Sequence, residues 1–210
     1  MIKILPSDYS YAPYFHKPEI DPWVLGILKK LKKSKILDIG TGLGFWGFII
    51  KHISPKCLSI GVDISKEALI KLKGFNIYDS LICADARYLP LKEKVFDLLI
   101  SVEAVHRFLT KELLLYYEKV LNSKGAILFV FPTEPNLTNI LLDLGYNVYG
   151  VFFGGFLTSG TCILLNVKTG GVITRQTKSI TILSSALLLR IIYSLFKLRL
   201  IRYCIAIKQK

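Results

Sequence analysis

Cysteine and methionine are scarce in this sequence of 210 residues. Met1 is the only methionine, and the cysteines form no C-x-x-C pair, so zinc-ligand spacing is absent and we expect no metal site. Their wide separation gives no indication of a disulfide framework. Each cysteine has apolar neighbours, which predicts buried free thiols in a reducing cytoplasm. The four are Cys57, Cys83, Cys162 and Cys204.

Acidic residues are absent from the last third of the chain. Residues 144–210 hold 9 Lys/Arg and no Asp/Glu, a net charge of +9, whereas residues 1–143 carry a net charge of +4. This asymmetry favours a negatively charged partner for the C-terminal part: nucleic acid, an anionic membrane surface or a phosphorylated substrate. A solvated basic face in a generally basic proteome explains the charge equally well.

A long apolar run of clear membrane-spanning character is also missing. Residues 144–167 lack charge and are long enough to cross a bilayer, but glycines and hydroxyl side chains divide them into strand-like pieces. Residues 180–201 are interrupted by three basic residues and predict a helix over about 180–199, packed on the core or lying on an anionic membrane surface. The N-terminal residues do not resemble a signal peptide. We expect a cytoplasmic protein, with peripheral membrane contact as the alternative.

Short apolar runs alternate with helical patterns over the first two thirds of the chain. Ser65 and Thr110 are suited to begin helices, since Glu67 and Glu112 follow in the first turns. Strands that alternate with helices predict βαβ units and a mostly parallel sheet. The predicted strands are 35–39, 58–62, 81–84, 96–101 and 126–131, and the predicted helices are 44–53, 65–72, 110–121 and 137–144, the last ended by Gly145.

A glycine-rich turn, Gly40-Thr41-Gly42-Leu43-Gly44, connects the first predicted strand to the first of these helices. Glycines let the backbone turn sharply and let a ligand lie against it. In open α/β sheets, ligands bind beyond the carboxyl ends of the strands, where Asp38, Asp63 and Asp85 end successive strands. Asp63 is placed to accept hydrogen bonds from ribose hydroxyls, Asp85 from an adenine amino group, and Asp38 faces an ammonium group.

Two cofactors fit a turn of this kind. The pattern Gly42-x-Gly44-x-x-Gly47, with Asp63 about twenty residues on, formally matches the dinucleotide fingerprint. A pyrophosphate needs a helix N-terminus without nearby anions, whereas Asp38 ends the strand that feeds this turn. S-adenosylmethionine (SAM) carries an ammonium and a sulfonium group but no phosphate, so the same acid helps it bind. We therefore favour the methyl donor over a nicotinamide cofactor.

Residues 34–153 resemble the class I SAM-dependent methyltransferases. LDIGTGLG is similar to their first motif, GVDIS to their second and CADARYLPL to their third, and FDLLISVEAVHRF is similar to their fourth strand and the loop after it. The resemblance implies SAM as cofactor and S-adenosylhomocysteine (SAH) as product, with Ser101 beside the sulfonium. It also implies donor contacts from Asp38, Gly40, Gly42 and Gly44, with Thr41 in the same turn, and from Asp63, Ile64, Asp85 and Ala86.

The resemblance further implies a Rossmann-like α/β fold. We expect a mostly parallel seven-stranded sheet with helices on both faces, an antiparallel last strand and a C-terminal insertion. A sixth strand is predicted over 147–153, a hairpin over 162–167 and 172–175, and a last strand over 202–208. The chain then forms a single domain: an N-terminal lid or helix (1–33), a SAM-binding core (34–153) and a basic hydrophobic region (154–210).

The acceptor is less defined than the donor. Glu103 and His106 follow the fourth strand, where acceptor chemistry occurs, and His106 is a candidate general base or a structural histidine. The segments FPTEPN and SVEAVH resemble enzymes that methylate small molecules or lipids such as quinones, which is our first expectation. RNA bound by the basic C-terminal region is the second. A nicotinamide oxidoreductase and a non-catalytic SAM-binding protein are the alternatives from other classes.

Aromatic residues gather near the N-terminus. They form either a lid over the site or, as we favour, a peripheral core patch. The cluster comprises Tyr9, Tyr11, Tyr14, Phe15 and Trp23.

Overall fold

The computed structural model describes residues 35–132, 134–153, 162–166, 172–175 and 203–209, together with positions 24, 26, 28 and 29. The strands are β1 (Lys35–Ile39), β2 (Leu58–Asp63), β3 (Ser80–Cys83), β4 (Phe96–Val102), β5 (Leu121–Pro132), β6 (Asn147–Phe153), β7 (Cys162–Asn166), β8 (Val172–Arg175) and β9 (Tyr203–Gln209). The helices are α2 (Phe45–Ile53), α3 (Lys66–Lys73), α4 (Lys111–Val120) and α5 (Pro135–Asp143), with short 3-10 helices η1 (Ala86–Tyr88) and η2 (His106–Phe108).

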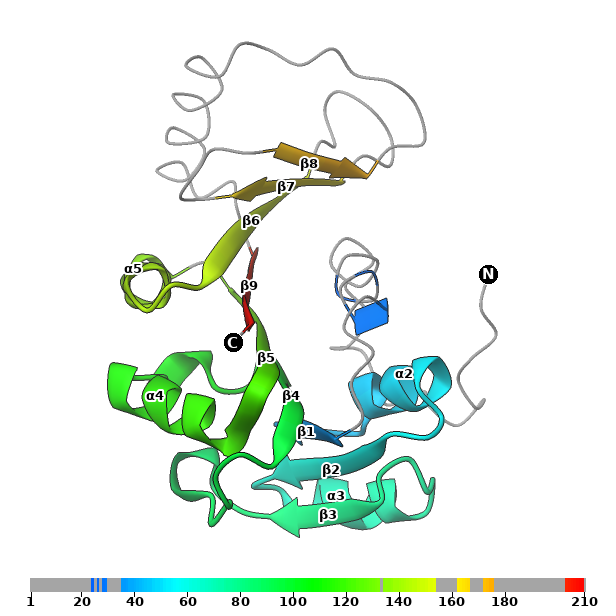
Figure 1. The fold of residues 1–210 in the computed structure, drawn as a ribbon. Coiled ribbons are helices and arrows are strands. Elements are labelled where there is room, and N and C mark those ends of the chain that lie inside the picture. The colour runs from blue at the N-terminus through cyan, green and yellow to red at the C-terminus, as the bar shows by residue number, and fades with distance from the viewer. Residues whose placement is uncertain are drawn as a thin grey trace.

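One twisted sheet runs through the molecule (Figure 1), with the strand order β3-β2-β1-β4-β5-β9-β6-β7-β8. Strands β1 to β5 are parallel, and β9 lies antiparallel between β5 and β6. The predicted seven-stranded core with an antiparallel last strand is therefore confirmed. The predicted hairpin, observed as β7–β8, continues this sheet from the edge of β6 to a total of nine strands.

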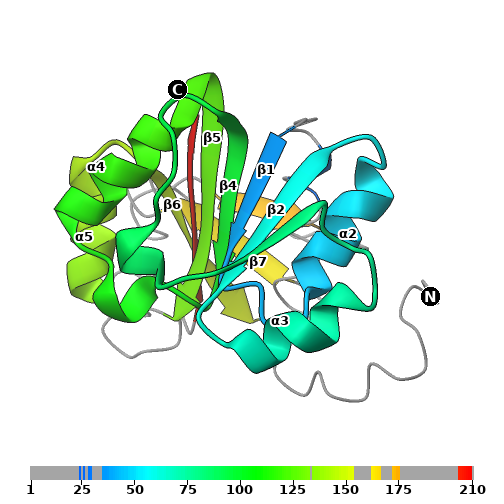
Figure 2. The ribbon, with the colours of Figure 1, turned by 90° about the horizontal axis from the view of Figure 1, so that it is seen from below.

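Helices cover both faces of the sheet (Figure 2): α4 and α5 lie on one face, and α2 and α3 on the other. Alternate strand residues feed the two layers, as the two-residue period of a strand requires. Leu37 and Ile39 pack with the α4–α5 side, whereas Ile36 packs with Phe45 and Ile50 of α2. The strands therefore carry near-continuous apolar runs, the pattern expected of parallel strands buried on both faces.

The predicted helix ends are confirmed by their hydrogen bonds. The hydroxyl of Ser65 accepts from the Ala68 N–H, and that of Thr110 accepts from the Leu113 N–H, both at 3.2 Å. Gly145 (φ 81°) closes α5 in the left-handed conformation, which its missing side chain permits. These caps hold α3 and α4 in place just after the strand ends that form the site.

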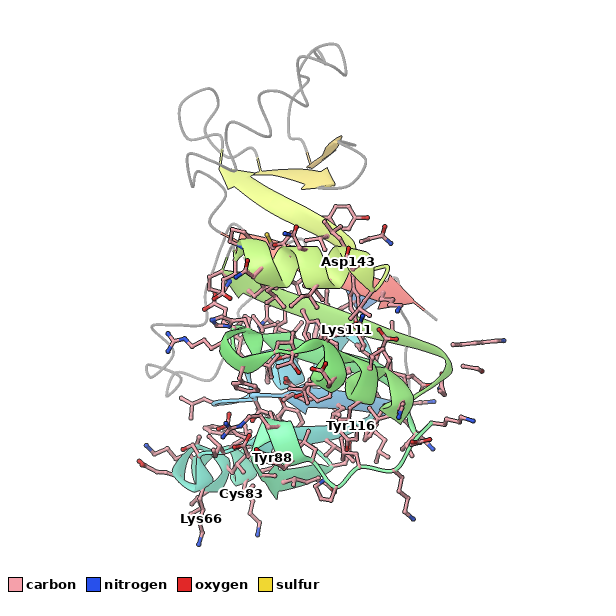
Figure 3. The ribbon with its side chains drawn as sticks, turned by 90° about the vertical axis from the view of Figure 1, so that its left-hand side faces the viewer. Lys66, Cys83, Tyr88, Lys111, Tyr116 and Asp143 are labelled. Atoms are coloured by element: carbon pink, nitrogen blue, oxygen red, sulfur yellow. The ribbon has the colours of Figure 1, made fainter. Side chains whose placement is uncertain are left out.

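One sequence prediction differs from the structure, and two others concern residues that the structure does not describe. Cys57 and Cys204 are buried as predicted, but Cys83 is exposed, because it ends the edge strand β3 (Figure 3). The N-terminal aromatic cluster and the helix over 180–199 lie outside the described residues. Among the described residues, no helix has the length and apolar character needed to cross a membrane.

A half-buried lysine attaches β9 to the rest of the fold. Lys208 Nζ lies 2.9 Å from Glu118 Oε1 of α4 and donates to the Leu144 carbonyl oxygen at 2.7 Å. It also lies 5.3 Å from the centre of the Tyr146 ring. Because β9 separates β5 from β6, this contact joins the two helices of one face to the strand that completes the core.

We predict that Lys208→Ala lowers the free energy of unfolding by about 2 kcal/mol, because it leaves the Glu118 carboxylate half-buried without its cation. Chemical denaturation measures the change. Lys71→Ala is the matched control, since Lys71 pairs with Glu67 on the exposed surface of α3, where such pairs contribute about 0.5 kcal/mol or less. Equal effects of the two substitutions would contradict the assignment.

Candidate functional site

The glycine-rich turn is attached to the end of β2 by backbone hydrogen bonds. The N–H groups of Gly40 and Thr41 both donate to the Val62 carbonyl oxygen, at 2.8 and 3.1 Å. Gly40, Gly42 and Gly44 all have positive φ angles, of 77°, 51° and 81°. A side chain at any of the three would strain this backbone, so the sequence folds here into a turn that exposes main chain instead of side chains.

Gly40 also permits a close approach between two loops. A Cβ atom placed on Gly40 would lie 2.0 Å from the Cβ of Ala104, which follows β4. The turn after β1 and the loop after β4 therefore touch across the edge of the sheet.

A cavity of about 320 Å³ lies at the carboxyl ends of β1 to β4. Five of the predicted donor-binding residues line it: Gly40, Asp63, Ile64, Asp85 and Ala86. Val105 and Phe108 from the loop after β4 add apolar surface to its wall. The side chain of Ile64 is 70% exposed, which leaves a large apolar group available to a ligand.

Asp63 is held by backbone donors at both carboxylate oxygens. One oxygen accepts from the Gly42 N–H and the other from the Ser65 N–H, each at 2.8 Å. The carboxylate thus joins the glycine-rich turn to the start of α3. Its orientation at the cavity wall is fixed before any ligand arrives.

Asp85 is paired with an arginine that the sequence analysis missed. The Arg87 guanidinium donates to both carboxylate oxygens, with Nη2 to Oδ2 at 2.6 Å, and the Arg87 N–H donates to Oδ1. These hydrogen bonds lower the pKa of Asp85 to about 2. The guanidinium also lies 5.7 Å from the centre of the Phe108 ring, so Arg87 joins the loops after β3 and β4. The sequence feature that could have indicated this pair is the position of Arg87, two residues after Asp85.

Asp38 lies behind the turn and not on the cavity wall. It is 3% exposed, and its Oδ2 accepts a hydrogen bond of 2.5 Å from the Tyr78 hydroxyl. Burial raises the pKa of Asp38 to about 7, the Tyr78 hydrogen bond opposes that rise, and the nearby Asp63 carboxylate adds to it. The acid that was expected to face an ammonium group is therefore buried at the end of β1.

The other predicted donor residues support the turn from within. Thr41 and Ser101 are buried, and the Ser101 hydroxyl donates to the Ile39 carbonyl oxygen at 2.8 Å, which ties β4 to β1. Gly42 is bonded to Asp63, and Gly44 begins α2. None of these four lines the described cavity.

The two predicted catalytic residues lie in the loop after β4, outside the cavity lining. Glu103 has a left-handed backbone (φ 56°), which is unusual for a residue other than glycine, and its N–H donates to the Val130 carbonyl oxygen. The Nδ1 atom of His106 is buried and has no hydrogen-bond partner among the described residues. Burial lowers the pKa of His106, and the Glu134 carboxylate opposes this shift. The approach of Glu134 after β5 was missed by sequence reasoning.

A second cavity, of about 470 Å³, adjoins the first through Arg87 and Phe108. Tyr88 of η1 and Tyr116 of α4, both labelled in Figure 3, line it. Within the described part of the chain, no group of three His, Cys, Asp or Glu side chains is arranged to hold a metal ion.

Comparison with known proteins shows which family this site resembles. Residues 37–129, which contain the turn, the three strand-end acids and the loop after β4, match the family model described as a methyltransferase domain. Over these residues the chain is similar to a methyltransferase domain, as its sequence resemblance to the class I SAM-dependent methyltransferases implies. The match supports SAM as the cofactor, which is the expectation drawn from the sequence.

Three proteins illustrate what this chain is similar to. The tRNA (carboxymethyluridine(34)-5-O)-methyltransferase of Saccharomyces cerevisiae is 31% identical over 48% of this chain and 36% of its own length. The malonyl-[acyl-carrier protein] O-methyltransferase of Marinomonas sp. (strain MWYL1) is 30% identical over 64% of this chain and 52% of its own. The plantazolicin methyltransferase BpumL, solved in complex with SAH, shares the fold with a TM-score of 0.60 at 16% identity, covering 92% of this chain and 86% of that one.

The chain spans about a third to a half of the length of these curated relatives. The matched part is the core that holds the turn and the cavity.

We predict that Gly40→Ala lowers the free energy of unfolding by about 2 kcal/mol or more and abolishes SAH binding, because the new methyl group meets Ala104 on a backbone with φ 77°. Chemical denaturation and calorimetric titration measure the two effects. The control is Gly74→Ala, where φ is −65° and the nearest atom would be 3.6 Å away. That substitution should stabilise the fold by about 0.4–1 kcal/mol and leave binding unchanged. A stable, binding-competent Gly40→Ala protein would refute this role of the turn.

Proposed function

We propose that this protein transfers the methyl group of SAM to a carboxylate oxygen of a small or acyl-type acceptor. The observation that carries the proposal is the cavity at the ends of β1 to β4, which brings the predicted donor residues of three successive strands together within the part of the chain that matches a methyltransferase domain. The donor half of the proposal rests on this chain's own geometry. The acceptor half rests on its relatives.

In this proposal the cavity holds the adenosine part of the donor. Asp63, already oriented by two N–H groups, accepts from the ribose hydroxyls. Ile64 lies against one face of the adenine, with Val105 and Phe108 on the opposite wall. Asp85 accepts from the adenine amino group, and the Ala86 backbone lies beside the ring. The residues fit the cofactor because acids meet its hydrogen-bond donors and apolar side chains meet its base.

The methionine part of the donor then rests on the Gly40–Gly44 turn, with Asp38 behind it. Ser101 acts as a support for β1 and not as a contact to the sulfonium, since its hydroxyl is engaged by Ile39. The segments 1–33 and 154–210 flank this core in sequence, and we propose that all three parts form one domain.

The bound donor supplies a methyl group on a sulfonium, which is displaced in line by a nucleophile. The protein's task is then to hold the donor rigidly, to align the acceptor and to exclude water. Orientation alone supplies about 7–11 kcal/mol of barrier lowering in well-aligned reactions. The turn and the two fixed carboxylates provide this rigidity on the donor side.

A carboxylate acceptor is supported by the names of the two curated relatives. One acts on carboxymethyluridine of tRNA and the other on a malonyl group, and each name describes transfer to oxygen of a molecule that carries a carboxyl group. A carboxyl group has a pKa of about 4 and is already ionised at neutral pH. Such an acceptor needs no general base, so His106 would orient it as a hydrogen-bond donor, whereas the Glu103 carboxylate would repel it and would act only through the shape of the loop. A hydroxyl acceptor would instead require His106 as base.

The acyl-type acceptor also agrees with the small-molecule or lipid-like expectation from the sequence. The second candidate is a carboxylate on a modified nucleoside of RNA, which the tRNA-modifying relative and the net charge of +13 favour. Peripheral membrane contact through residues 180–199 and a cytoplasmic location stay predictions.

We predict that Ile64→Ala weakens SAH binding about three- to tenfold, because the exposed side chain loses its contact with the adenine, while the unfolding midpoint stays unchanged. Calorimetric titration with SAH tests this. Ile70→Ala is the matched control, since Ile70 is 64% exposed on α3 and lies outside the cavity lining. Binding of NADH in place of SAH would overturn the proposed function.

We predict that the methyl product is an ester and is released as methanol by mild alkali. The measurement uses methyl-labelled SAM with three acceptors in parallel: a long-chain dicarboxylic acid, a malonyl thioester and bulk tRNA. Volatile label from either of the first two supports the acyl-type acceptor, and volatile label from tRNA alone supports the second candidate. Alkali-stable label in every product would exclude a carboxylate acceptor.

A further inference from the structure

The hydrogen bond between Tyr78 and Asp38 joins segments forty residues apart. Tyr78 precedes β3, and its hydroxyl donates to Oδ2 of Asp38 at 2.5 Å. Asp38 lies in β1, two residues before Gly40, with only 3% of its surface exposed. A tyrosine from the far side of β2 therefore reaches the buried acid behind the glycine-rich turn.

Three glycines make room for the Tyr78 ring. A Cβ atom on Gly47 of α2 would lie 2.1 Å from the ring Cζ and 2.2 Å from the hydroxyl oxygen. A Cβ on Gly44 would lie 3.3 Å from the ring, and one on Gly61 of β2 would lie 3.2 Å from it. Gly47 is the third glycine of the dinucleotide-like pattern. Because Gly47 has no side chain, the Tyr78 ring fits against α2 at this position.

Among the described residues, the surroundings of Asp38 contain few other charges. Asp63 is the carboxylate whose charge bears on it, and Tyr78 is the titratable group that touches it. Lys51, on α2 over the same face of the sheet, is engaged by Asp79 and the Cys57 carbonyl oxygen. Desolvation disfavours an isolated carboxylate in such a place, whereas a hydroxyl donor favours its ionised form.

We propose that Tyr78 is a positioning residue for the amino-acid end of the donor: its hydroxyl orients Asp38 and favours its carboxylate form behind the Gly40–Gly44 turn, where the negative charge attracts the α-ammonium group of SAM. This inference rests on the proposed donor site. Tyr78 touches no donor atom and acts through Asp38. The adenosine end, held by Asp63 and Asp85, does not depend on it.

Donor binding is then linked to a proton. Burial raises the pKa of Asp38 to about 7, so the acid is about half protonated at that pH before the donor binds. The ammonium group favours the charged form, and the Asp38 proton leaves to solvent on binding. Affinity for SAH therefore falls as the pH drops from 8 to 6.

The first test compares two ligands in calorimetric titrations of the full chain. SAH carries the amino-acid part, and 5′-methylthioadenosine lacks it. Tyr78→Phe should weaken SAH binding at pH 7 about tenfold, the effect of a lost hydrogen bond to a charged group. It should change binding of 5′-methylthioadenosine by less than twofold. A merely structural role of Tyr78 would weaken both ligands alike and would overturn the proposal.

The second test is the pH profile. SAH titrations of the wild type at pH 6 in two buffers of different ionisation enthalpy should show release of close to one proton. Tyr78→Phe should move the fall in affinity to higher pH, and Asp38→Asn should remove the pH dependence. A wild-type affinity for SAH that is constant from pH 6 to pH 8 would overturn the inference and leave the proposed function intact.

Two further variants separate the hydroxyl from general packing. Tyr116→Phe removes another hydroxyl that donates to a buried acceptor, the Leu89 carbonyl oxygen, away from Asp38, and should leave both ligands unaffected. Gly47→Ala keeps the tyrosine but displaces its ring, and should reproduce the selective loss of SAH binding. Unfolding midpoints identify any variant that fails to fold. If the wild type binds neither ligand, the proposed function fails, and the inference fails with it.

Discussion

The attachment of the Gly40–Gly44 turn to the end of β2 is the constraint on which the rest of the site depends. Two N–H groups of the turn share the Val62 carbonyl oxygen, and a third donates to the side chain of the next residue, Asp63. These bonds require positive φ angles, which only glycine adopts without strain. Because β1 and β2 are parallel neighbours, the same bonds fix both strand ends at one edge of the sheet. The cavity wall is then set by backbone geometry and needs no ligand to form.

Two aspartates at this edge are tuned in opposite directions. Hydrogen bonds from Arg87 lower the pKa of Asp85, whereas burial raises that of Asp38. Asp85 therefore stays ionised throughout the physiological range, while Asp38 changes its charge near neutrality. Aspartates at the ends of β1 and β3 thus give one pH-sensitive and one pH-independent end to the same site. The difference comes from Arg87, whose hydrogen bonds lower the pKa of Asp85, and from the burial of Asp38, which the Tyr78 hydrogen bond offsets only in part.

The strands and helices of the core could be predicted from the sequence within one or two residues, apart from β5, because buried apolar runs alternate with capped helices. β5 begins five residues early, at Leu121, which pairs with Phe96 before an irregularity in the ladder. The cavity-lining acids were predictable as strand ends. The roles of Tyr78 and Arg87 were not, because they depend on which distant or paired group each side chain meets. The nine-stranded sheet was not predictable either, since the sequence of the hairpin does not specify which strand the hairpin pairs with.

The residues proposed to bind the donor are easier to recognise in the sequence than those proposed to meet the acceptor. The donor half is built from main chain and strand ends, so its glycines and acids recur at regular places. We propose that the acceptor half lies in the loops after β4 and β5, where Glu103, His106 and Glu134 approach one another only in the folded chain. Glu103 holds a left-handed backbone there, a conformation that costs about 1–3 kcal/mol and persists only where the surrounding structure imposes it. Strain retained beside the cavity, next to a buried histidine nitrogen without a partner among the described residues, supports the proposal that the acceptor meets this loop.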